Sequence, residues 1–429
     1  MLSQHLLRSR ISIPFKRFQH TIKQHDVIIA RSLSKPDEKF YISQPLEPGK
    51  VINTGNGYIP HEMIIGKPCR TLVEPLPMAK KKNELRDAVS PKPAKYILCR
   101  PTMEEYVTNR KREAQPIYPL DAGLIVQLAD ITVDLPEMCE DQQNGDAVNW
   151  NKYLQEGLKQ TDRECSEVWR GKSLDVEDPY DKYVNARQEK FKKMNVGGKK
   201  IITKEAPQQF LECGTGHGSL TLNIVRAIHS GNAYYDGEDD RSRGAILHSL
   251  DKKLKHLKVG MGNLKHFARG MYWPDVEFHL CENGLSEWLD GECASYYREV
   301  VGRGSPNGFL SGVFLDLPSP ELHLSKLAQD LGVDCPIIVF VPSVMQIWDC
   351  LSKVKNEGIK LTLTKTYELM PGSGGGGMRE WNLRKAIIRE TGLEGMVVRP
   401  KVGVRVVGGG FIGVFKKLPN SSVVKEWKE

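Results

Sequence analysis

The 429-residue sequence has no long hydrophobic run and no paired cysteine motif. No apolar stretch approaches the roughly 20 residues that a bilayer-crossing helix needs, so we expect no membrane partner. The nine cysteines are scattered and contain no C-x-x-C pair. Their arrangement fits free thiols in a reducing compartment and argues against a disulfide framework or a zinc site. We therefore predict no metal ligands.

Acidic residues are absent from positions 1–25, which carry Arg8, Arg10, Lys16, Arg17 and Lys23 among several Ser and Leu residues. This composition is typical of a mitochondrial transit peptide, and the alternative is a disordered basic tail. Removing the segment would lower the formal charge from +8 to about +3 (8 − 5). A charge that small does not by itself indicate nucleic-acid binding.

Two domains are predicted from the patterning. Residues 26–100 contain short strand-like segments separated by Gly- and Pro-containing turns, which indicate a small all-β domain. The strand-like segments are 26–29, 40–42, 50–53, 62–65 and 95–99. Residues 101–429 form the second domain, which a polar insertion at 134–207 interrupts.

A glycine-rich turn opens the main part of the second domain, where residues 210–221 read FLECGTGHGSLT. An apolar strand ends at Glu212, a tight turn contains Gly214, Gly216 and Gly218, and an apolar helix follows over 220–228. The G-x-G-x-G spacing differs from the dinucleotide-binding motif, and no P-loop lysine follows. A short turn after an acid suits S-adenosylmethionine, with Glu212 near its cationic end. The alternative is an ordinary tight turn.

Strands then alternate with helices, which predicts an open α/β sheet of the Rossmann-like class. Strands are expected over 245–250, 276–280, 312–315, 336–341, 360–368 and 411–416, and further helices over 101–112, 122–131 and 252–267. Asp251, Glu282 and Asp316 follow three of these strands, at the edge where such sheets bind ligands. Asp251 suits a ribose or caps the next helix. A helix after 343 carries a periodic apolar stripe in which Trp348 is expected to be core.

Several motifs, taken in order, resemble the tRNA adenine-N1 methyltransferase family, the type that modifies adenine 58 in the T-loop. They are GYIPH at 57–61, IGK at 65–67, RPT at 100–102, IYPLD at 117–121, the glycine turn, DLPSP at 316–320, FVPS at 340–343 with Gln346, EW at 380–381 and GF at 410–411. The resemblance implies a class I S-adenosylmethionine-dependent methyltransferase domain after a small β domain. It also implies a tetramer, either of identical chains or with a non-catalytic subunit.

Site residues follow from the same resemblance. It places the methionine part of the cofactor on Gly214, Gly216, His217, Gly218, Ser219 and Leu220, and its ribose on Asp251. Glu282 would flank the adenine, and Gln115 and Asp121 would line the cofactor's other side. Asp316 would border the cofactor and act as the catalytic carboxylate. Three positions depart from the family pattern: His217, Glu321 and the Gly408–Gly410 run.

The chemistry implied is methylation of adenine N1, which leaves the base positively charged. Asp316 would accept a hydrogen bond from the exocyclic amine, with the Leu317 carbonyl as a second acceptor in a loop stiffened by Pro318. RNA phosphates would meet basic clusters at 110–112, with Arg110 and Arg112, at 252–258 and at 416–417. Each cluster could instead be a solvated surface.

The leading hypothesis is therefore an enzyme that methylates mitochondrial tRNA. Two alternatives remain open. One is the same chemistry on mitochondrial rRNA. The other is a catalytically reduced RNA-binding or mitoribosome-associated protein with the same fold.

Overall fold

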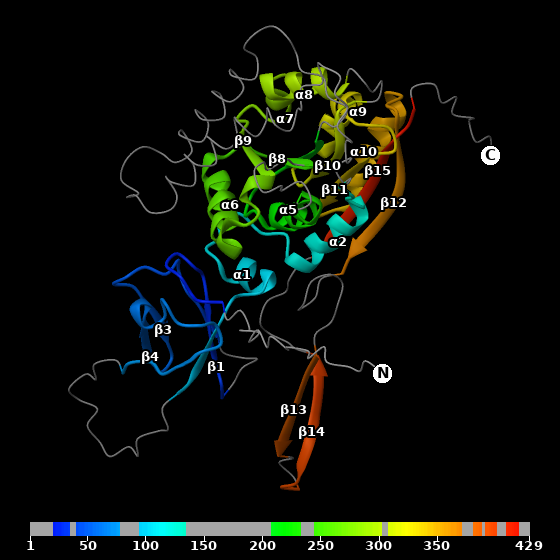
Figure 1. Ribbon diagram of the computed structural model, residues 1–429. Coiled ribbons are helices and arrows are strands. Elements are labelled where there is room, and N and C mark those ends of the chain that lie inside the picture. Colours follow the sequence, from blue (N-terminus) through cyan, green and yellow to red (C-terminus); the bar gives the residue numbers. More distant parts are fainter. Residues whose placement is uncertain are drawn as a thin grey trace, which may run out of the picture. The chain divides into compact units, whose positions relative to one another are not determined.

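The computed structural model describes residues 20–34, 40–77, 94–133, 207–232, 244–302, 308–370, 381–387, 391–400 and 409–419 (Figure 1). The chain divides into two compact units, Met1–Thr102 and Met103–Glu429. The division lies close to the boundary expected at residue 100. The basic residues up to 19 and all but the last residue of the insertion predicted at 134–207 lie outside the described residues.

The first unit is a small β structure. Its four-stranded antiparallel sheet has the order β2-β1-β6-β5, and β3 and β4 form a separate hairpin. The bounds are β1 Ile29–Ser32, β2 Phe40–Ile42, β3 Val51–Thr54, β4 Gly57–Pro60, β5 Leu72–Val73 and β6 Tyr96–Cys99. The strand expected at 62–65 is wrong. A 3-10 turn, η1 His61–Met63, stands there, because the amides of Ile64 and Ile65 both bond to the His61 carbonyl.

Residues 20–25 belong to this unit. Thr21 forms a bridge with Pro68, the His25 amide donates to the Leu46 carbonyl, and Ile22 is 1% exposed within the core. A basic leader extending to residue 25 therefore includes residues that the β unit needs. If a leader is cleaved, the cut belongs before residue 20.

The second unit contains a seven-stranded sheet of order β12-β15-β11-β10-β7-β8-β9. The five strands from β11 to β9 pair in parallel, whereas β15 pairs antiparallel with both β11 and β12. The bounds are β7 Gln208–Cys213, β8 Ala245–Asp251, β9 Val276–Leu280, β10 Leu310–Leu315, β11 Pro336–Val341, β12 Leu361–Leu369 and β15 Gly410–Lys417. This arrangement confirms the predicted open α/β sheet.

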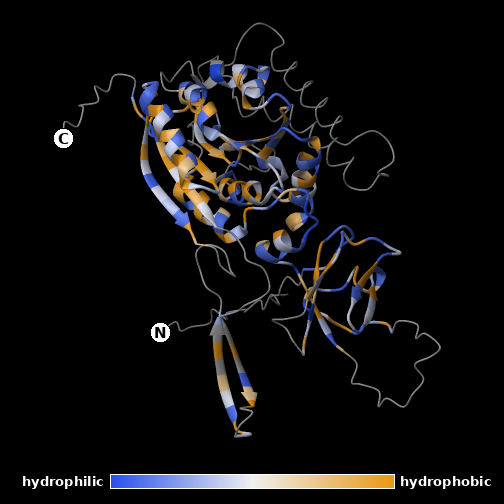
Figure 2. Cartoon of the chain, turned by 180° about the vertical axis from the view of Figure 1, so that it is seen from behind, coloured by the Kyte–Doolittle hydropathy of each residue, from blue (hydrophilic) through white to orange (hydrophobic). Residues whose placement is uncertain are grey.

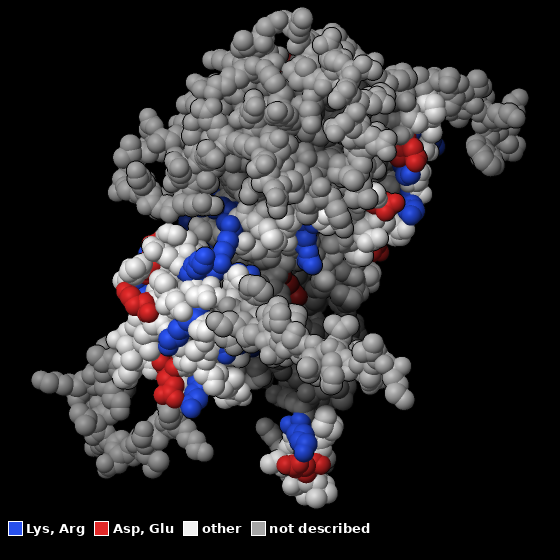
Figure 3. All heavy atoms as spheres, viewed as in Figure 1, with Lys and Arg blue, Asp and Glu red and all other residues white. Residues whose placement is uncertain are grey.

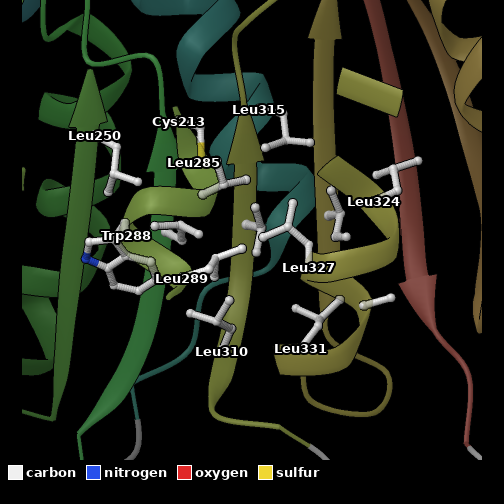
Figure 4. Close-up of a cluster of buried hydrophobic side chains, with 14 of the residues drawn as sticks. Cys213, Leu250, Leu285, Trp288, Leu289, Leu310, Leu315, Leu324, Leu327 and Leu331 are labelled. Atoms are coloured by element: carbon white, nitrogen blue, oxygen red, sulfur yellow. The ribbon is translucent and has the colours of Figure 1, made fainter. Parts of the chain in front are cut away.

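Helices cover both faces of this sheet (Figure 1). On one face, α7, α8, α9 and α10 share a continuous hydrophobic cluster with the strands, part of which Figure 4 shows around Trp288 of α7 and Leu250 of β8. The other face carries α5 and α6, and α2 packs on α5. Hydrophobic colours dominate the central strands in Figure 2, while the helices carry both colours. Such two-sided burial is what a parallel sheet requires.

The helices of this unit are mostly amphipathic and short. Their bounds are α1 Met103–Asn109, α2 Pro119–Ala129, α5 Ser219–Asn232, α6 Leu254–His266, α7 Leu285–Leu289, α8 Glu292–Gly302, α9 Leu324–Asp330 and α10 Val344–Asn356. Three 3-10 turns complete the described part: η3 Phe267–Gly270, η4 Trp273–Asp275 and η5 Pro320–His323.

A two-stranded antiparallel hairpin, β13 Trp381–Ile387 with β14 Glu394–Pro400, was not anticipated from the sequence. Its hydrophobic side chains at Trp381, Leu383 and Met396 are exposed. An isolated two-stranded hairpin is only marginally stable in water, so this element needs support from another surface.

Trp348 in α10 is 57% exposed, which contradicts its expected place in the core. The buried stripe of this helix consists of Ile347, Cys350 and Val354, packed toward the sheet. One residue of helix rotates a side chain by about 100°, so the neighbour of a buried position readily faces outward.

Substituting Ile347 and Trp348 one at a time should distinguish the buried face of α10 from its exposed face. Ile347→Ala removes a side chain that is 2% exposed and should lower the free energy of unfolding by about 2–5 kcal/mol. Trp348→Ala should lower it by less than about 1 kcal/mol, although the side chain is larger. Urea unfolding followed by circular dichroism measures both. A greater loss for Trp348→Ala would contradict the assigned faces.

Candidate active site

The carboxyl ends of β7, β8 and β10 meet at one edge of the sheet. Cys213 at the end of β7 is in register with Leu250 of β8 on one side and with Leu315 of β10 on the other. The strand order reverses at β7, and open α/β sheets bind ligands at this kind of switch point. The glycine turn and Asp316 therefore emerge side by side.

The glycine turn touches the backbone of Asp316 directly. Gly214 has φ +107°, and a Cβ added there would lie 2.1 Å from the Asp316 carbonyl oxygen. Gly218, with φ +79°, packs on the backbone of Gly260 in α6, 2.9 Å from where its Cβ would be. Both positions exclude a side chain on conformational and steric grounds. The turn is thus fixed between β10 and α6.

Asp251 binds the turn with its carboxylate. Oδ2 accepts a hydrogen bond of 2.9 Å from the Gly216 amide, and Oδ1 accepts one of 2.8 Å from the Lys253 amide at the start of α6. Lys253 itself is the N-cap residue of α6 and no side chain caps it, so Asp251 holds the turn that leads into the helix and is not its cap. A carboxylate offers about four acceptor sites, so ribose hydroxyls remain compatible with these bonds.

Glu212 lies beneath the turn, completely buried. Oε2 accepts hydrogen bonds from Ser249 (2.6 Å) and Thr221 (2.7 Å), and no hydrogen-bond partner reaches Oε1 within the described residues. Burial raises the pKa of Glu212 to about 8, although the two hydroxyl bonds oppose this shift. The side chain supports the turn from inside, so the contact predicted with a cationic ligand could run only through Oε1.

Asp316 stands at the end of β10, half-buried, with its amide bonded to the Cys213 carbonyl. Burial, and then the negative charge of Asp251, raise the pKa of Asp316 to about 7. Asp316 and Asp251 in turn contribute to the raised pKa of Glu212. Three acidic groups therefore surround one glycine turn. Such mutual repulsion is relieved by a bound cation, which makes the site suited to a positively charged ligand.

The loop between α1 and α2 crosses the glycine turn. Ala114 lies 3.6 Å from the position of a Cβ on Gly216, and the Ser219 hydroxyl donates to the Ile117 carbonyl. Gln115 is exposed between these two anchor points, where the resemblance places it beside the cofactor. Asp121 is 1% exposed within α2. Its side chain is therefore buried where α2 packs on the rest of the domain.

His217 is buried against α6. Asn263 donates to the His217 carbonyl at 2.9 Å and lies 3.2 Å from its Nε2. Burial, and then the charges of Arg112 and Arg110, lower the pKa of His217 to about 4. The ring is thus a neutral part of the turn's packing on α6.

The remaining predicted site residues differ in exposure. Glu282 is exposed just after β9, at the same edge of the sheet, and Leu220 is buried at the start of α5. Leu317 is half-buried and Pro318 exposed in the loop after Asp316. Both positions are therefore accessible from solvent beside Asp316.

The basic clusters are only partly available. Arg110 donates to Asn263 Oδ1 at 3.3 Å, and Arg112 donates to the Thr108 carbonyl at 3.0 Å, which leaves several of the five donors of each guanidinium. Lys255 pairs with Glu113 at 2.6 Å. On the face in Figure 3, the described Lys and Arg side chains lie singly or in small groups among acidic ones.

The proposed cluster at 416–417 is wrong. Lys417 is 8% exposed and donates to the Ala328 carbonyl, while Lys416 pairs with Asp334 at 2.9 Å. Alternation along β15 turns one of two adjacent lysines inward. A pair of lysines at a strand end therefore does not form a surface patch here.

Several supporting residues escaped the sequence reasoning. Ser249 and Thr221 hold Glu212, Asn263 holds His217, and Gly260 makes room for Gly218. Thr221 closes the motif at 210–221, whereas Ser249, Asn263 and Gly260 belong to no recognisable motif. Only Gly260, a glycine inside a helical pattern, carries a sequence signal of close packing.

Comparison with known proteins shows what this chain is similar to. No family model matches the chain. The tRNA (adenine(58)-N(1))-methyltransferase TrmI of Thermus thermophilus is 24% identical over 346 residues, which is 80% of this chain and 84% of that protein, in each of two strains. This finding confirms the resemblance that the motifs indicate.

Among solved structures, an S-adenosylmethionine-dependent O-methyltransferase of Thermotoga maritima has a TM-score of 0.51 at 13% identity, covering 94% of this chain and 97% of that chain. A tRNA (m1A58) methyltransferase TrmI of Aquifex aeolicus has a TM-score of 0.46 at 16% identity, covering 93% and 99%. The first structure confirms the class I methyltransferase fold.

Gly214→Ala should disrupt the turn, because the new methyl group would collide with the Asp316 backbone. We expect the free energy of unfolding to fall by about 2 kcal/mol or more. Gly262→Ala is the control, since nothing lies within 4 Å of its Cβ position in α6. That variant should gain about 0.5–1 kcal/mol. Equal effects in urea unfolding would refute the contact.

The raised pKa of Glu212 predicts a pH-dependent stability. The folded pKa of about 8 exceeds the ordinary 4.5, so the protein is most stable while Glu212 is protonated, and stability falls as pH rises toward 8. Between about pH 6 and pH 8, ionisation of Glu212 should lower the free energy of unfolding by about 2 kcal/mol, and Glu212→Gln should abolish this part of the decrease. Glu282→Gln, which changes an exposed carboxyl, should leave the loss intact. Unfolding experiments at both pH values measure this loss of stability. An unchanged dependence of stability on pH in Glu212→Gln would disprove the assignment.

Proposed function

We propose that the chain is an S-adenosylmethionine-dependent methyltransferase that modifies N1 of adenine in tRNA, at position 58 of the T-loop. The observation that carries the proposal is the direct contact between the glycine turn at Gly214 and the backbone of Asp316. It brings a cofactor-binding turn and a carboxylate to one edge of the sheet. The curated relatives of that name support the same reaction.

The residues at this edge fit the cofactor. S-adenosylmethionine carries a sulfonium and an ammonium group, and Asp251 and the ionised form of Asp316 supply the complementary negative charge, while Glu212 supports the turn from inside. Gly214 and Gly218 keep side chains out of the turn, so a ligand can approach the backbone closely. Asp251 can still accept ribose hydroxyls, and Glu282 follows β9 where an adenine would extend.

The bound cofactor supplies a methyl group activated on a sulfonium. The protein's task is then to align adenine N1 with that methyl and to stabilise the positive charge that develops on the base. Asp316 accepts a hydrogen bond from the exocyclic amine and places its negative charge beside the ring. The Leu317 carbonyl offers a second acceptor, and Pro318 restricts the loop that holds it. Asp316 performs this role only when ionised.

The base must leave its stack to reach Asp316, as other base-modifying enzymes require. Arg110 and Arg112 keep unused donors near the glycine turn, and these can hold the RNA backbone. The exposed hydrophobic residues of the β13–β14 hairpin favour association of two or more copies, in line with the tetramer that the resemblance implies.

Location in the mitochondrial matrix is part of the proposal, and the basic, acid-free composition before residue 20 supports it. Methylation of mitochondrial rRNA is the second candidate target, since the chemistry at Asp316 would be identical. Mapping N1-methyladenosine in mitochondrial and cytosolic RNA, with and without the gene, distinguishes these targets. Loss confined to tRNA position 58 in mitochondria is the expected result. No loss anywhere would overturn the enzymatic proposal.

Asp316→Ala should reduce methyl transfer to a T-loop transcript by on the order of 10²–10³-fold. Binding of S-adenosylmethionine, measured by calorimetry, should persist. In the unaltered protein, kcat/KM should rise as pH increases through about 7, because the raised pKa keeps Asp316 protonated below that value. A transcript with guanine at position 58 is the control substrate. Full activity in the variant would exclude Asp316 from catalysis.

A further inference from the structure

A second cluster of polar side chains lies inside the methyltransferase domain, away from the glycine turn. His248 on β8 is in register with Glu277 on β9, and His279 follows two residues later on the same strand. Side chains two apart on a strand, and those in register on adjacent strands, share one face of a sheet. All three therefore point to the face covered by α7 and α8, where Cys293 of α8 meets them.

The four side chains converge closely. One ligand-type atom from each of His248, Glu277, His279 and Cys293 lies within 4.8 Å of every other. His248 Nδ1 is 3.1 Å from His279 Nε2 and 3.6 Å from a Glu277 carboxylate oxygen. In a tetrahedral zinc site, bonds of about 2.0–2.3 Å place neighbouring ligand atoms roughly 3.3–3.8 Å apart. The cluster therefore needs only small side-chain adjustments to surround one ion.

The other ring nitrogen of His248 is already oriented. Nε2 lies 2.7 Å from Gln209 Oε1, an acceptor, so Nε2 carries the proton and Nδ1 presents its lone pair to the cluster. Metal-binding histidines commonly have such a partner on the nitrogen that faces away from the metal. The rings of Trp288 and Tyr297 lie 5.0 and 5.3 Å from His248 and enclose the site in hydrophobic surroundings.

The donor set favours zinc. Imidazole nitrogen, thiolate sulfur and a carboxylate oxygen are all zinc ligands, and four protein ligands make a closed, structural site. Two neutral imidazoles, one thiolate and one carboxylate around Zn²⁺ give zero net charge. All four residues are buried, with His248 completely so and Cys293 8% exposed. Charge neutrality is therefore what this environment requires.

We propose that His248, Glu277, His279 and Cys293 bind a structural Zn²⁺ ion in the core between β8, β9 and α8. Binding displaces the thiol proton of Cys293 to solvent, and no electron transfer is involved. The ion joins the two strands whose ends carry Asp251 and Glu282, so it fixes the spacing of those residues. This site is independent of the methyl-transfer proposal, because its formation requires no cofactor and no RNA.

Metal content tests the site directly. Because the cluster is buried, the ion must enter during folding, so the full chain is produced without a metal-binding tag in medium supplemented with zinc. We expect about one zinc ion per chain after exhaustive dialysis. Production with cobalt instead should give the absorption of a tetrahedral Co²⁺ complex with a thiolate-to-cobalt charge-transfer band. Zinc well below stoichiometry together with no cobalt spectrum would overturn the proposal and leave a hydrogen-bonded polar cluster.

Matched cysteine variants locate the ligand. Cys293→Ser should abolish the charge-transfer band and lower zinc content severalfold. Cys350→Ser, another buried cysteine outside the cluster, should retain both. Refolding with zinc at about 1,000 times Kd, rather than with a chelator, should raise Tm by on the order of 10 °C in the unaltered protein. An unchanged Tm, or a retained band in Cys293→Ser, would reject the assignment even if a variant folds poorly.

Discussion

The parallel pairing of β7 with β8 on one side and with β10 on the other is the constraint on which the site depends. It carries the glycine turn, Asp251 and Asp316 to the same edge, although more than a hundred residues separate the first and last in sequence. The fit is tight enough that Gly214 touches the Asp316 backbone. Interiors are close-packed, so a displacement of either strand would disturb both groups together.

The two faces of these strands serve different purposes. Glu212 and Ser249 face α5, where their hydrogen bonds support the turn from below. His248 and Glu277 face α7 and α8, where they join the polar cluster. Alternation of side chains along a strand produces this division from adjacent residues. Concentrated acidic groups at the edge cost stability in the ligand-free protein, and a cationic ligand offsets that cost.

Sequence patterns predicted the elements of the α/β sheet well, because fully buried parallel strands are continuous apolar runs between polar segments. They failed where local patterns fit two structures. The segment at 62–65 looks like a strand, but its amides close a turn onto His61. Trp348 follows the helical stripe closely enough to suggest burial, yet the exposed side of α10 begins there. The β13–β14 hairpin lacks the strong turn signal that identifies hairpins.

The sequence by itself determined the class of fold, the glycine turn and the acidic residues that follow the strands, because these depend on local propensity and on residue order. Tertiary structure alone decided which of those acids are accessible at the edge of the sheet and which are fully buried, as Asp316 and Glu212 show. It also assembled His248, Glu277, His279 and Cys293, whose spacing resembles no metal motif. Residues distant in sequence meet only when strands pair and a helix covers them, and no local pattern encodes that meeting.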